Sequence, residues 1–149
     1  MRGELSGGCL CGAVRYTVRE GMRMQPYACH CTDCQSRTGS GFSEHMLFAL
    51  PDLTIEGELD EGHYTQPSGA RSTIFGCAVC KARLYATNDE RVGMASLRCG
   101  TLDDSAALDI RHHIWVRSKQ PWIGLAADAA TMDEQPREPE GWVAFLGQQ

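Results

Sequence analysis

Cysteine spacing constrains this chain more than any other feature of its sequence. Seven of the eight cysteines in its 149 residues fall into short figures, Cys-x-Cys at 9/11 and 29/31 and Cys-x-x-Cys at 31/34 and 77/80. The stretch from 27 to 34 reads YACHCTDC and holds three thiols and an imidazole within six positions. Zinc sites in proteins use cysteine thiolates at such spacings. We therefore interpret these cysteines as metal ligands.

The first cysteine pair is better suited to a shared metal ion than to a disulfide. In an extended chain the Cα atoms of Cys9 and Cys11 would lie about 6.7 Å apart on one face, near the upper limit for a disulfide. A tetrahedral zinc ion with Zn–S bonds of about 2.3 Å needs its sulfurs only about 3.8 Å apart. The sequence GCAVC at 76 to 80 has the spacing of a zinc knuckle, and Gly76 eases its turn. The predicted four-thiolate site consists of Cys9, Cys11, Cys77 and Cys80.

The three other clustered cysteines predict a second zinc ion with an open position. Cys29, Cys31 and Cys34 can wrap a metal among themselves but supply only three ligands. Structural zinc usually has four protein ligands, whereas catalytic zinc typically keeps three and an exchangeable position. The chain therefore predicts two zinc ions, one structural and one working. The alternative is that Cys99 or a histidine closes the second site. Cys99 could equally be a buried small hydrophobe, and His30 should point away from its two neighbouring cysteines in an extended stretch.

Composition narrows the class of protein. A net charge of -5 and a pI near 5.5 give no basic surface for nucleic acid or anionic lipid. No apolar run approaches the roughly 18 residues of a membrane span. Cysteine content lies below the roughly 8–10% of secreted disulfide scaffolds, and no signal-like segment comes first. We expect a soluble, reduced, cytoplasmic protein that binds neither nucleic acid nor membrane.

The hydrophobic pattern predicts a mainly β fold with few short helices. Val14, Tyr16 and Val18 alternate with polar residues, as in a strand with one buried face. The segment LDIRHHIWV, residues 108 to 116, is predicted to be a strand on the same grounds. Short helices are possible over 32 to 38 and around 123 to 130. Residues 1–131 are expected to form one domain, and 132–149 a polar C-terminal tail that is at most partly docked, through Trp142 to Leu146.

Five ordered motifs resemble one known family. GGCLCGAVRY, CHCTDCQSRTGS, FGCAVC, GTLDD and HIWVRSKQPW lie in that order between about residues 7 and 125. Together they resemble the glutathione-dependent formaldehyde-activating enzymes (GFA family), whose domain is shared with centromere protein V. The resemblance implies antiparallel β-sheets of the zinc-bearing β-tent kind. It also implies a structural zinc on Cys9, Cys11, Cys77 and Cys80 and an open zinc on Cys29, Cys31 and Cys34.

The activity that the resemblance implies is a carbon–sulfur lyase reaction, in which glutathione adds to formaldehyde and gives S-(hydroxymethyl)glutathione. Three thiolates on Zn²⁺ leave a net charge of -1, which makes the metal a weak activator of water but still able to hold a thiolate. The catalytic candidates are then Cys29, Cys31 and Cys34. Arg37 could clamp a glutathione carboxylate. His45 or Glu44 could supply the acid.

Other interpretations remain open at this stage. The same domain could be a non-catalytic, zinc-stabilised interaction module, which a closed second site would favour. A third possibility is a thiol redox or metal-handling protein, in which Cys29, Cys31 and Cys34 exchange electrons or metal. His113 matches the family's His-Ile-Trp element but receives no role. The sequence leaves the oligomeric state undetermined.

Overall fold

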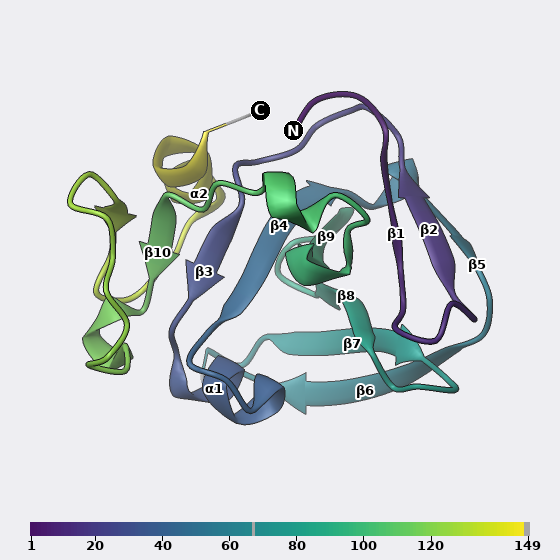
Figure 1. Cartoon of the computed structure of the whole chain (residues 1–149). Helices are drawn as coiled ribbons and strands as arrows, with labels where there is room; N and C mark the ends of the chain where they lie inside the picture. Colours follow the sequence, from purple (N-terminus) through teal and green to yellow (C-terminus); the bar gives the residue numbers. More distant parts are fainter. Residues whose placement is uncertain (67, 148–149) are drawn as a thin grey trace.

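The computed structural model describes residues 1–66 and 68–147. Within them the chain is mainly β, with two sheets and two short α helices (Figure 1). The three-stranded sheet contains β1 (Leu5–Gly8), β2 (Arg15–Val18) and β5 (Leu53–Glu56), in the order β1-β2-β5. The eight-stranded sheet has the order β11-β10-β3-β4-β9-β8-β7-β6 and contains β3 (Tyr27–Cys29), β4 (Ser43–Ala49), β6 (Leu59–Thr65), β7 (Arg71–Cys77), β8 (Arg83–Asn88), β9 (Met94–Arg98), β10 (His112–Ile114) and β11 (Ala130–Thr131). The helices are α1 (Thr32–Thr38) and α2 (Pro139–Leu146), and short 3-10 turns are η1 (Leu50–Asp52), η2 (Cys99–Thr101), η3 (Ser105–Ala107) and η4 (Val116–Ser118).

The small sheet follows the predicted alternation. Tyr16 and Val18 on β2 are buried, whereas Arg15, on the opposite face of the strand, is exposed. The Tyr16 hydroxyl lies 2.8 Å from the Thr101 hydroxyl, which ties β2 to the turn after β9. This contact satisfies a phenol that would otherwise be buried without a partner.

The large sheet is antiparallel from β3 to β6 and parallel at one edge. β10 pairs in parallel with both β3 and β11. The predicted strand over 108 to 116 was too long, because β10 spans only His112–Ile114. Its partner β3 offers just three residues, and the next residue, Trp115, adopts a left-handed φ of 58° that ends the strand. The helix expected around 123 to 130 is absent from the described structure there, and Ala130 instead begins β11.

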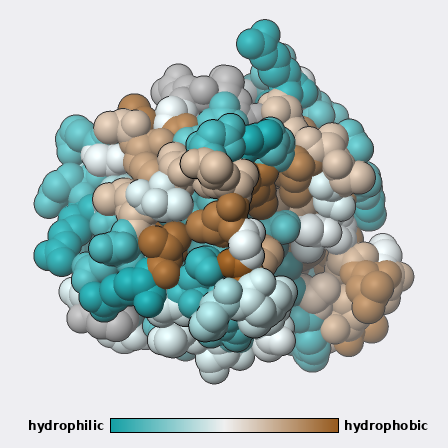
Figure 2. All heavy atoms as spheres, turned by 60° about the vertical axis from the view of Figure 1, so that its left-hand side comes forward, coloured by the Kyte–Doolittle hydropathy of each residue, from teal (hydrophilic) through white to brown (hydrophobic). Residues whose placement is uncertain are grey.

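Two apolar clusters fill the molecule. The larger lies between the two sheets and includes Val14, Tyr16, Phe48 and Leu97. The second lies beneath α2 and includes Tyr27, Leu47, Ile114, Trp142 and Leu146. Figure 2 turns the α2 and β10 side of the molecule forward and shows hydrophobic side chains gathered at its centre, with mainly hydrophilic side chains to their left.

The C-terminal segment contributes to the second cluster. On α2, Trp142 and Leu146 are buried, and the Trp142 ring lies 5.4 Å from the ring of Tyr27. Residues 148 and 149 of the expected tail lie outside the described residues, and the domain boundary at 131 stays an expectation. No helix in the described ranges is both long and apolar enough to cross a lipid bilayer.

Candidate metal centres and the adjacent cavity

The four-cysteine cluster consists of Cys9, Cys11, Cys77 and Cys80. Its first two members lie in the loop between β1 and β2, and the others at and just after the end of β7. Their sulfurs all lie within 4.8 Å of one another. The Cys9–Cys11 and Cys11–Cys77 sulfur separations are 3.6 and 3.8 Å, close to the roughly 3.8 Å edge of a zinc tetrahedron and far longer than a disulfide bond. The cluster could therefore hold a metal ion, and its donor set fits zinc.

Backbone amides surround these sulfurs. The amide of Val14 donates to the Cys9 sulfur at 3.2 Å, and the amides of Val79 and Cys80 donate to the Cys77 sulfur at 3.3 and 3.4 Å. Burial alone would raise the pKa of Cys9, but the Val14 amide and the neighbouring thiols lower that pKa to about 6. Thiolate is the form that binds metal. The folded loops thus favour the metal-binding form of at least this cysteine.

The three-cysteine cluster consists of Cys29, Cys31 and Cys34, whose sulfurs also lie within 4.8 Å of one another. Cys29 ends β3, Cys31 caps the N-terminus of α1, and Cys34 lies in its first turn and donates its amide to the Cys31 sulfur at 3.3 Å. Helix α1 matches the predicted range 32 to 38. The Cys29 and Cys31 thiols lower the pKa of Cys34, because their hydrogen bonds stabilise its thiolate. The cluster could hold a metal ion through three protein ligands.

The residues considered as a fourth ligand lie elsewhere. Cys99 is fully buried and belongs to neither group of potential metal ligands in the described structure. The His30 side chain points away from the cluster, and its Nε2 lies 3.0 Å from Nδ1 of His113. His113, left without a role by its motif, is therefore the partner of a buried imidazole.

His45 is the sequence candidate that reaches the three-cysteine cluster. Its Nε2 lies 3.9 Å from the Cys34 sulfur and 3.3 Å from Nη1 of Arg98, and its Nδ1 lies 2.9 Å from the Ser96 hydroxyl. Because a guanidinium can only donate, Nε2 of the neutral ring accepts and Nδ1 carries the proton. Burial lowers the pKa of His45, which keeps the ring neutral.

Glu44 lies on the opposite side of β4 from His45. It lines a separate hollow with His113, and burial raises the pKa of its carboxyl group. Of the two acid candidates named from the sequence, the structure brings only His45 to the cysteines.

A cavity of about 460 Å³ opens beside the three-cysteine cluster. Its lining includes four arginines, Arg37, Arg91, Arg98 and Arg117, against a single acidic residue, Asp33. Aromatic side chains complete the wall, namely Tyr27, Tyr64, Trp115 and Trp142. The cavity is thus positively charged although the whole chain is acidic, which suits it to an anionic ligand.

The expected clamp residue, Arg37, lies in this wall. Its guanidinium carbon is 3.2 Å from the centre of the Tyr64 ring, so the guanidinium group forms a cation–π contact with that ring. Arg91 stands 5.4 Å from the ring centre of Trp142 in the same way. These contacts fix two cations without neutralising them.

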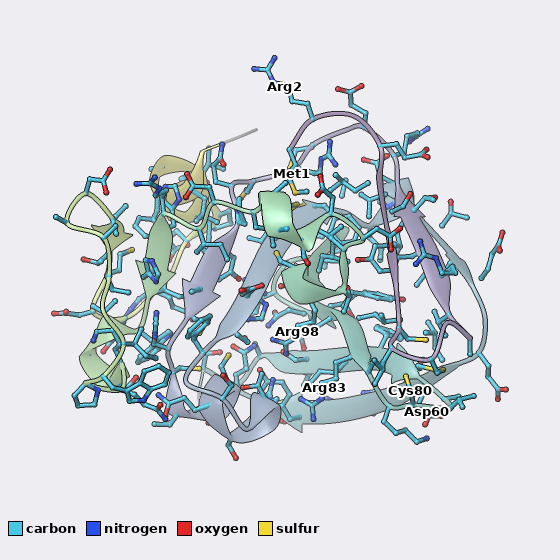
Figure 3. The ribbon with its side chains drawn as sticks, in the orientation of Figure 1. Met1, Arg2, Asp60, Cys80, Arg83 and Arg98 are labelled. Carbon is cyan, nitrogen blue, oxygen red and sulfur yellow. The ribbon has the colours of Figure 1, made fainter. Side chains whose placement is uncertain are left out.

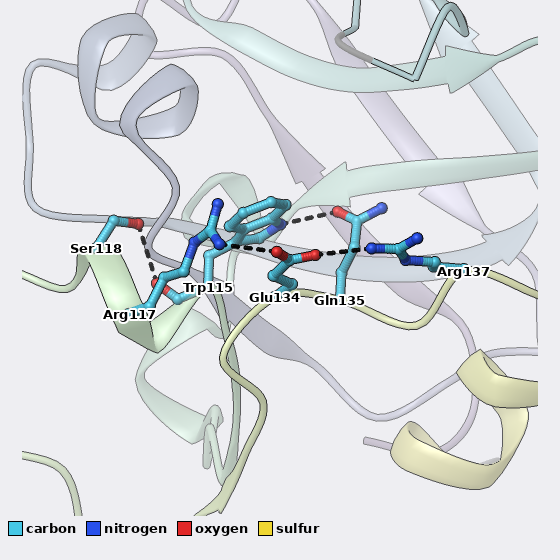
Figure 4. Close-up of polar contacts among 6 residues, drawn as sticks. All are labelled: Trp115, Arg117, Ser118, Glu134, Gln135 and Arg137. Atoms are coloured by element: carbon cyan, nitrogen blue, oxygen red, sulfur yellow. Dashed lines mark hydrogen bonds and ion pairs between the residues drawn. The ribbon is translucent and has the colours of Figure 1, made fainter.

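One side of the cavity is lined by Trp115, Arg117, Ser118 and Gln135, with Glu134 and Arg137 bonded beside them (Figure 4). The Trp115 indole donates to the side-chain oxygen of Gln135 at 3.0 Å. The Glu134 carboxylate accepts from Arg117 at 2.8 Å and from Arg137 at 3.2 Å (Figure 4). Arg117 is therefore the one cavity arginine already paired with a carboxylate in the described structure.

Several site residues were missed by sequence reasoning, because they come from elements distant in the chain. Arg98 and Ser96 belong to β9, Arg117 to η4 and Trp142 to α2. The one available signal was the spacing of two between Ser96 and Arg98, which puts both on one face of a strand. Which face that strand would present to the cysteines could not be read without the sheet order.

Comparisons with known proteins agree with the motifs. A family model described as "Glutathione-dependent formaldehyde-activating enzyme" matches residues 4–118. A crystal structure of a Rhodobacter sphaeroides protein superposes with a TM-score of 0.50 at 19% identity, and the match covers 66% of this chain and 88% of that one. This likeness supports the fold alone. No curated protein matches the chain.

Proposed function

The chain belongs to the glutathione-dependent formaldehyde-activating enzyme family, and from this premise we propose that it is a zinc-dependent carbon–sulfur lyase. Its substrates would be a small anionic thiol, such as glutathione, and formaldehyde or a related aldehyde. One observation carries the proposal. A cluster of only three cysteines stands at the wall of an arginine-lined cavity, whereas a cluster of four stands elsewhere. The four-cysteine cluster would hold a structural zinc, and the three-cysteine cluster the working one.

The net reaction joins the thiol sulfur to the aldehyde carbon, and the thiol proton ends on the aldehyde oxygen. A zinc ion on three thiolates would stabilise the thiolate form of an incoming thiol. The chain's own residues supply the rest of the site. The cavity arginines attract the ligand's carboxylates, Trp142 and Tyr27 restrict access of water, and the neutral His45 holds Arg98 close to the cysteines.

Cobalt-substituted protein tests this proposal. Glutathione, cysteine and small model thiols should each add a sulfur–cobalt charge-transfer band, whereas S-methylglutathione, which has no ionisable sulfur, should not. Calorimetry in buffers of different ionisation enthalpy should count about one proton released per thiol captured, less any lost from the free thiol.

The same titration separates the alternatives. If no thiol changes the cobalt spectrum, the open-site proposal fails and a non-catalytic interaction module takes its place. Ready and reversible disulfide formation among Cys29, Cys31 and Cys34 in zinc-free protein would instead favour the redox or metal-handling function. We also propose a reducing compartment such as the cytoplasm, because all eight cysteines are free.

A further inference from the structure

Three arginines lie close together without a carboxylate partner in the described structure. Arg37 and Arg98 line the cavity beside the three-cysteine cluster, and Arg83 lines the adjoining hollow with Arg37 and Cys77. Arg37 belongs to α1, Arg83 to β8 and Arg98 to β9. No ion pair within the described ranges includes any of them. Figure 3 shows Arg83 and Arg98 projecting from neighbouring strands on the side of the large sheet where α1 lies.

The acidic side chains nearest to Arg83 have other partners. Asp60 and Glu61 line a hollow of about 270 Å³ together with Arg37 and Arg83. Asp60 forms its ion pair with Lys81, and Glu61 lies 3.6 Å from His63. Among the described residues, neither carboxylate forms an ion pair with any of the three arginines.

The guanidinium groups of Arg37 and Arg83 lie close enough to that of Arg98 to repel it. Burial lowers the pKa of Arg98 first, and the charges of Arg83 and Arg37 lower it further, while Cys34 opposes the shift. Gathering like charges in a half-buried position destabilises a folded protein unless an anion binds between them. The side chains also have few internal ties. Among the described residues, the Arg98 guanidinium forms one side-chain hydrogen bond, to His45, and the Arg37 guanidinium lies over the face of Tyr64.

Their position relates them to the candidate metal site. The 3.3 Å contact from Arg98 to His45 and the 3.9 Å contact from His45 to Cys34 put the guanidinium within about two hydrogen-bond lengths of the Cys34 sulfur. Arg37 lines both the large cavity and the smaller hollow that contains Arg83. Arg37 thus lies between the two spaces, with Arg98 in the wall of the cavity and Arg83 in the wall of the hollow.

We propose that Arg37, Arg83 and Arg98 form an oxyanion subsite, which binds a carboxylate of the ligand whose thiol lies at the three-cysteine cluster. Guanidinium groups bind carboxylates through paired, charge-assisted hydrogen bonds. The short span from Arg98 to Cys34 favours a carboxylate only a few bonds from the thiol. The role of the thiol rests on the proposed function, whereas the anion subsite itself does not.

Three thiols of similar length test the charge preference on cobalt-substituted protein. They are 3-mercaptopropionate, 2-mercaptoethanol and cysteamine, whose far ends are anionic, neutral and cationic. Arg83→Gln should weaken binding of 3-mercaptopropionate by about tenfold, because a charge-assisted pair is lost. It should leave 2-mercaptoethanol unchanged and improve cysteamine. For each thiol, the affinity of the variant is compared with that of the wild type, so the different pKa values of the three free thiols cancel.

Two further variants match this one. Arg71→Gln removes an exposed guanidinium from β7, which forms no ion pair in the described part of the chain and lies outside both spaces, and should change none of the three affinities by more than about twofold. Arg83→Lys keeps the charge and should restore much of the preference. If Arg83→Gln and Arg71→Gln weaken 3-mercaptopropionate equally, or neither does, the subsite is refuted while thiol binding stands.

Phosphate titration tests the subsite without any thiol. In zinc-loaded protein, inorganic phosphate should shift the arginine Nε–Hε NMR signals of residues 37, 83 and 98 before that of Arg71, and Arg83→Gln should weaken phosphate binding. Phosphate shifts without any cobalt–thiol band would overturn the proposed function and retain the subsite. Equal shifts at Arg71 and the three arginines would overturn the subsite.

Discussion

The Nε2 atom of His45 lies 3.9 Å from the sulfur of Cys34, although one residue belongs to the middle of the large sheet and the other to α1. The other ring nitrogen is held by Ser96 of β9 at 2.9 Å. The imidazole therefore links the three-cysteine cluster to the interior of the sheet. Because the buried ring contacts Cys34, Ser96 and Arg98, it also holds these neighbouring side chains in position.

Replacing His45 by Phe should destabilise the protein by about 1–3 kcal/mol, because the buried Ser43 and Ser96 hydroxyls each lose a hydrogen bond and the Arg98 guanidinium loses the one side-chain hydrogen bond that it forms in the described structure. Urea denaturation of zinc-loaded protein measures the change. His63→Phe is the matched control, since His63 is exposed on the edge strand β6. Comparable losses in the two variants would contradict the structural role of the His45 network.

Cysteine replacements should separate the two clusters. Cys80→Ser should lower the melting temperature sharply, because binding at a structural zinc contributes folding free energy of roughly 10–16 kcal/mol in small zinc domains. Cys31→Ser should chiefly remove metal from the three-cysteine cluster and leave most of the stability. Zinc content by atomic absorption and thermal unfolding test both variants. Equal losses of stability would rule out this division between a structural and a working site.

Helix α2 should be an integral part of the fold. Trp142→Ala should cost about 3–5 kcal/mol, because it removes a buried aromatic ring packed against Tyr27. Val143→Ala, next to it but 46% exposed, should stay within about 0.5 kcal/mol of the wild type. Denaturant titration compares the two. A small loss at Trp142 would mean that the C-terminal segment only rests on the surface.

Stability below neutral pH should depend on His113. Burial lowers the pKa of His113, so the folded protein keeps this ring neutral where the unfolded chain, with a histidine pKa near 6.5, is already protonated. Its contribution is thus complete above pH 6.5 and is lost as pH falls towards the lowered folded pKa. The stability advantage of wild type over His113→Gln should shrink from pH 7.5 to pH 5.

Denaturation curves at a series of pH values measure this difference. Effects of acid on the cysteine clusters are common to both proteins and cancel in the comparison. An advantage of wild type that stays constant over the same range would show that His113 titrates alike in the folded and unfolded states.

The cysteine groups could be predicted from the sequence because their members lie in short Cys-x-Cys and Cys-x-x-Cys figures. Cys29, Cys31 and Cys34 lie within one strand end and one helical turn, so short-range geometry alone brings them together. Pairing Cys9 and Cys11 with Cys77 and Cys80 needed only a count of the sulfurs. The structure groups both sets in this way, while their roles as zinc ligands remain proposals.

The residues that line the cavity could not be predicted from the sequence, because the order of strands in the large sheet determines which side chains reach it. Arg98 approaches Cys34 only because β9 pairs with β4, and the sequence of β9 does not name its partner. The overlong strand predicted at 108 to 116 failed for a related reason. Apolar periodicity continues past Ile114, but hydrogen bonding ends where the three-residue β3 ends. Tertiary pairing overrides local pattern in both cases.

The two cysteine groups differ in how much chain must exist before they can close. Cys29, Cys31 and Cys34 span only six residues, so they can meet as soon as residue 34 has left the ribosome. Cys11 must wait about seventy residues for Cys80, which takes roughly 4 to 14 seconds at typical bacterial or eukaryotic synthesis rates. The longer loop also costs more entropy to close. Under the proposed function, zinc binding by the four-cysteine cluster would therefore follow the synthesis of β7 and would link the loop of the small sheet to the end of that strand.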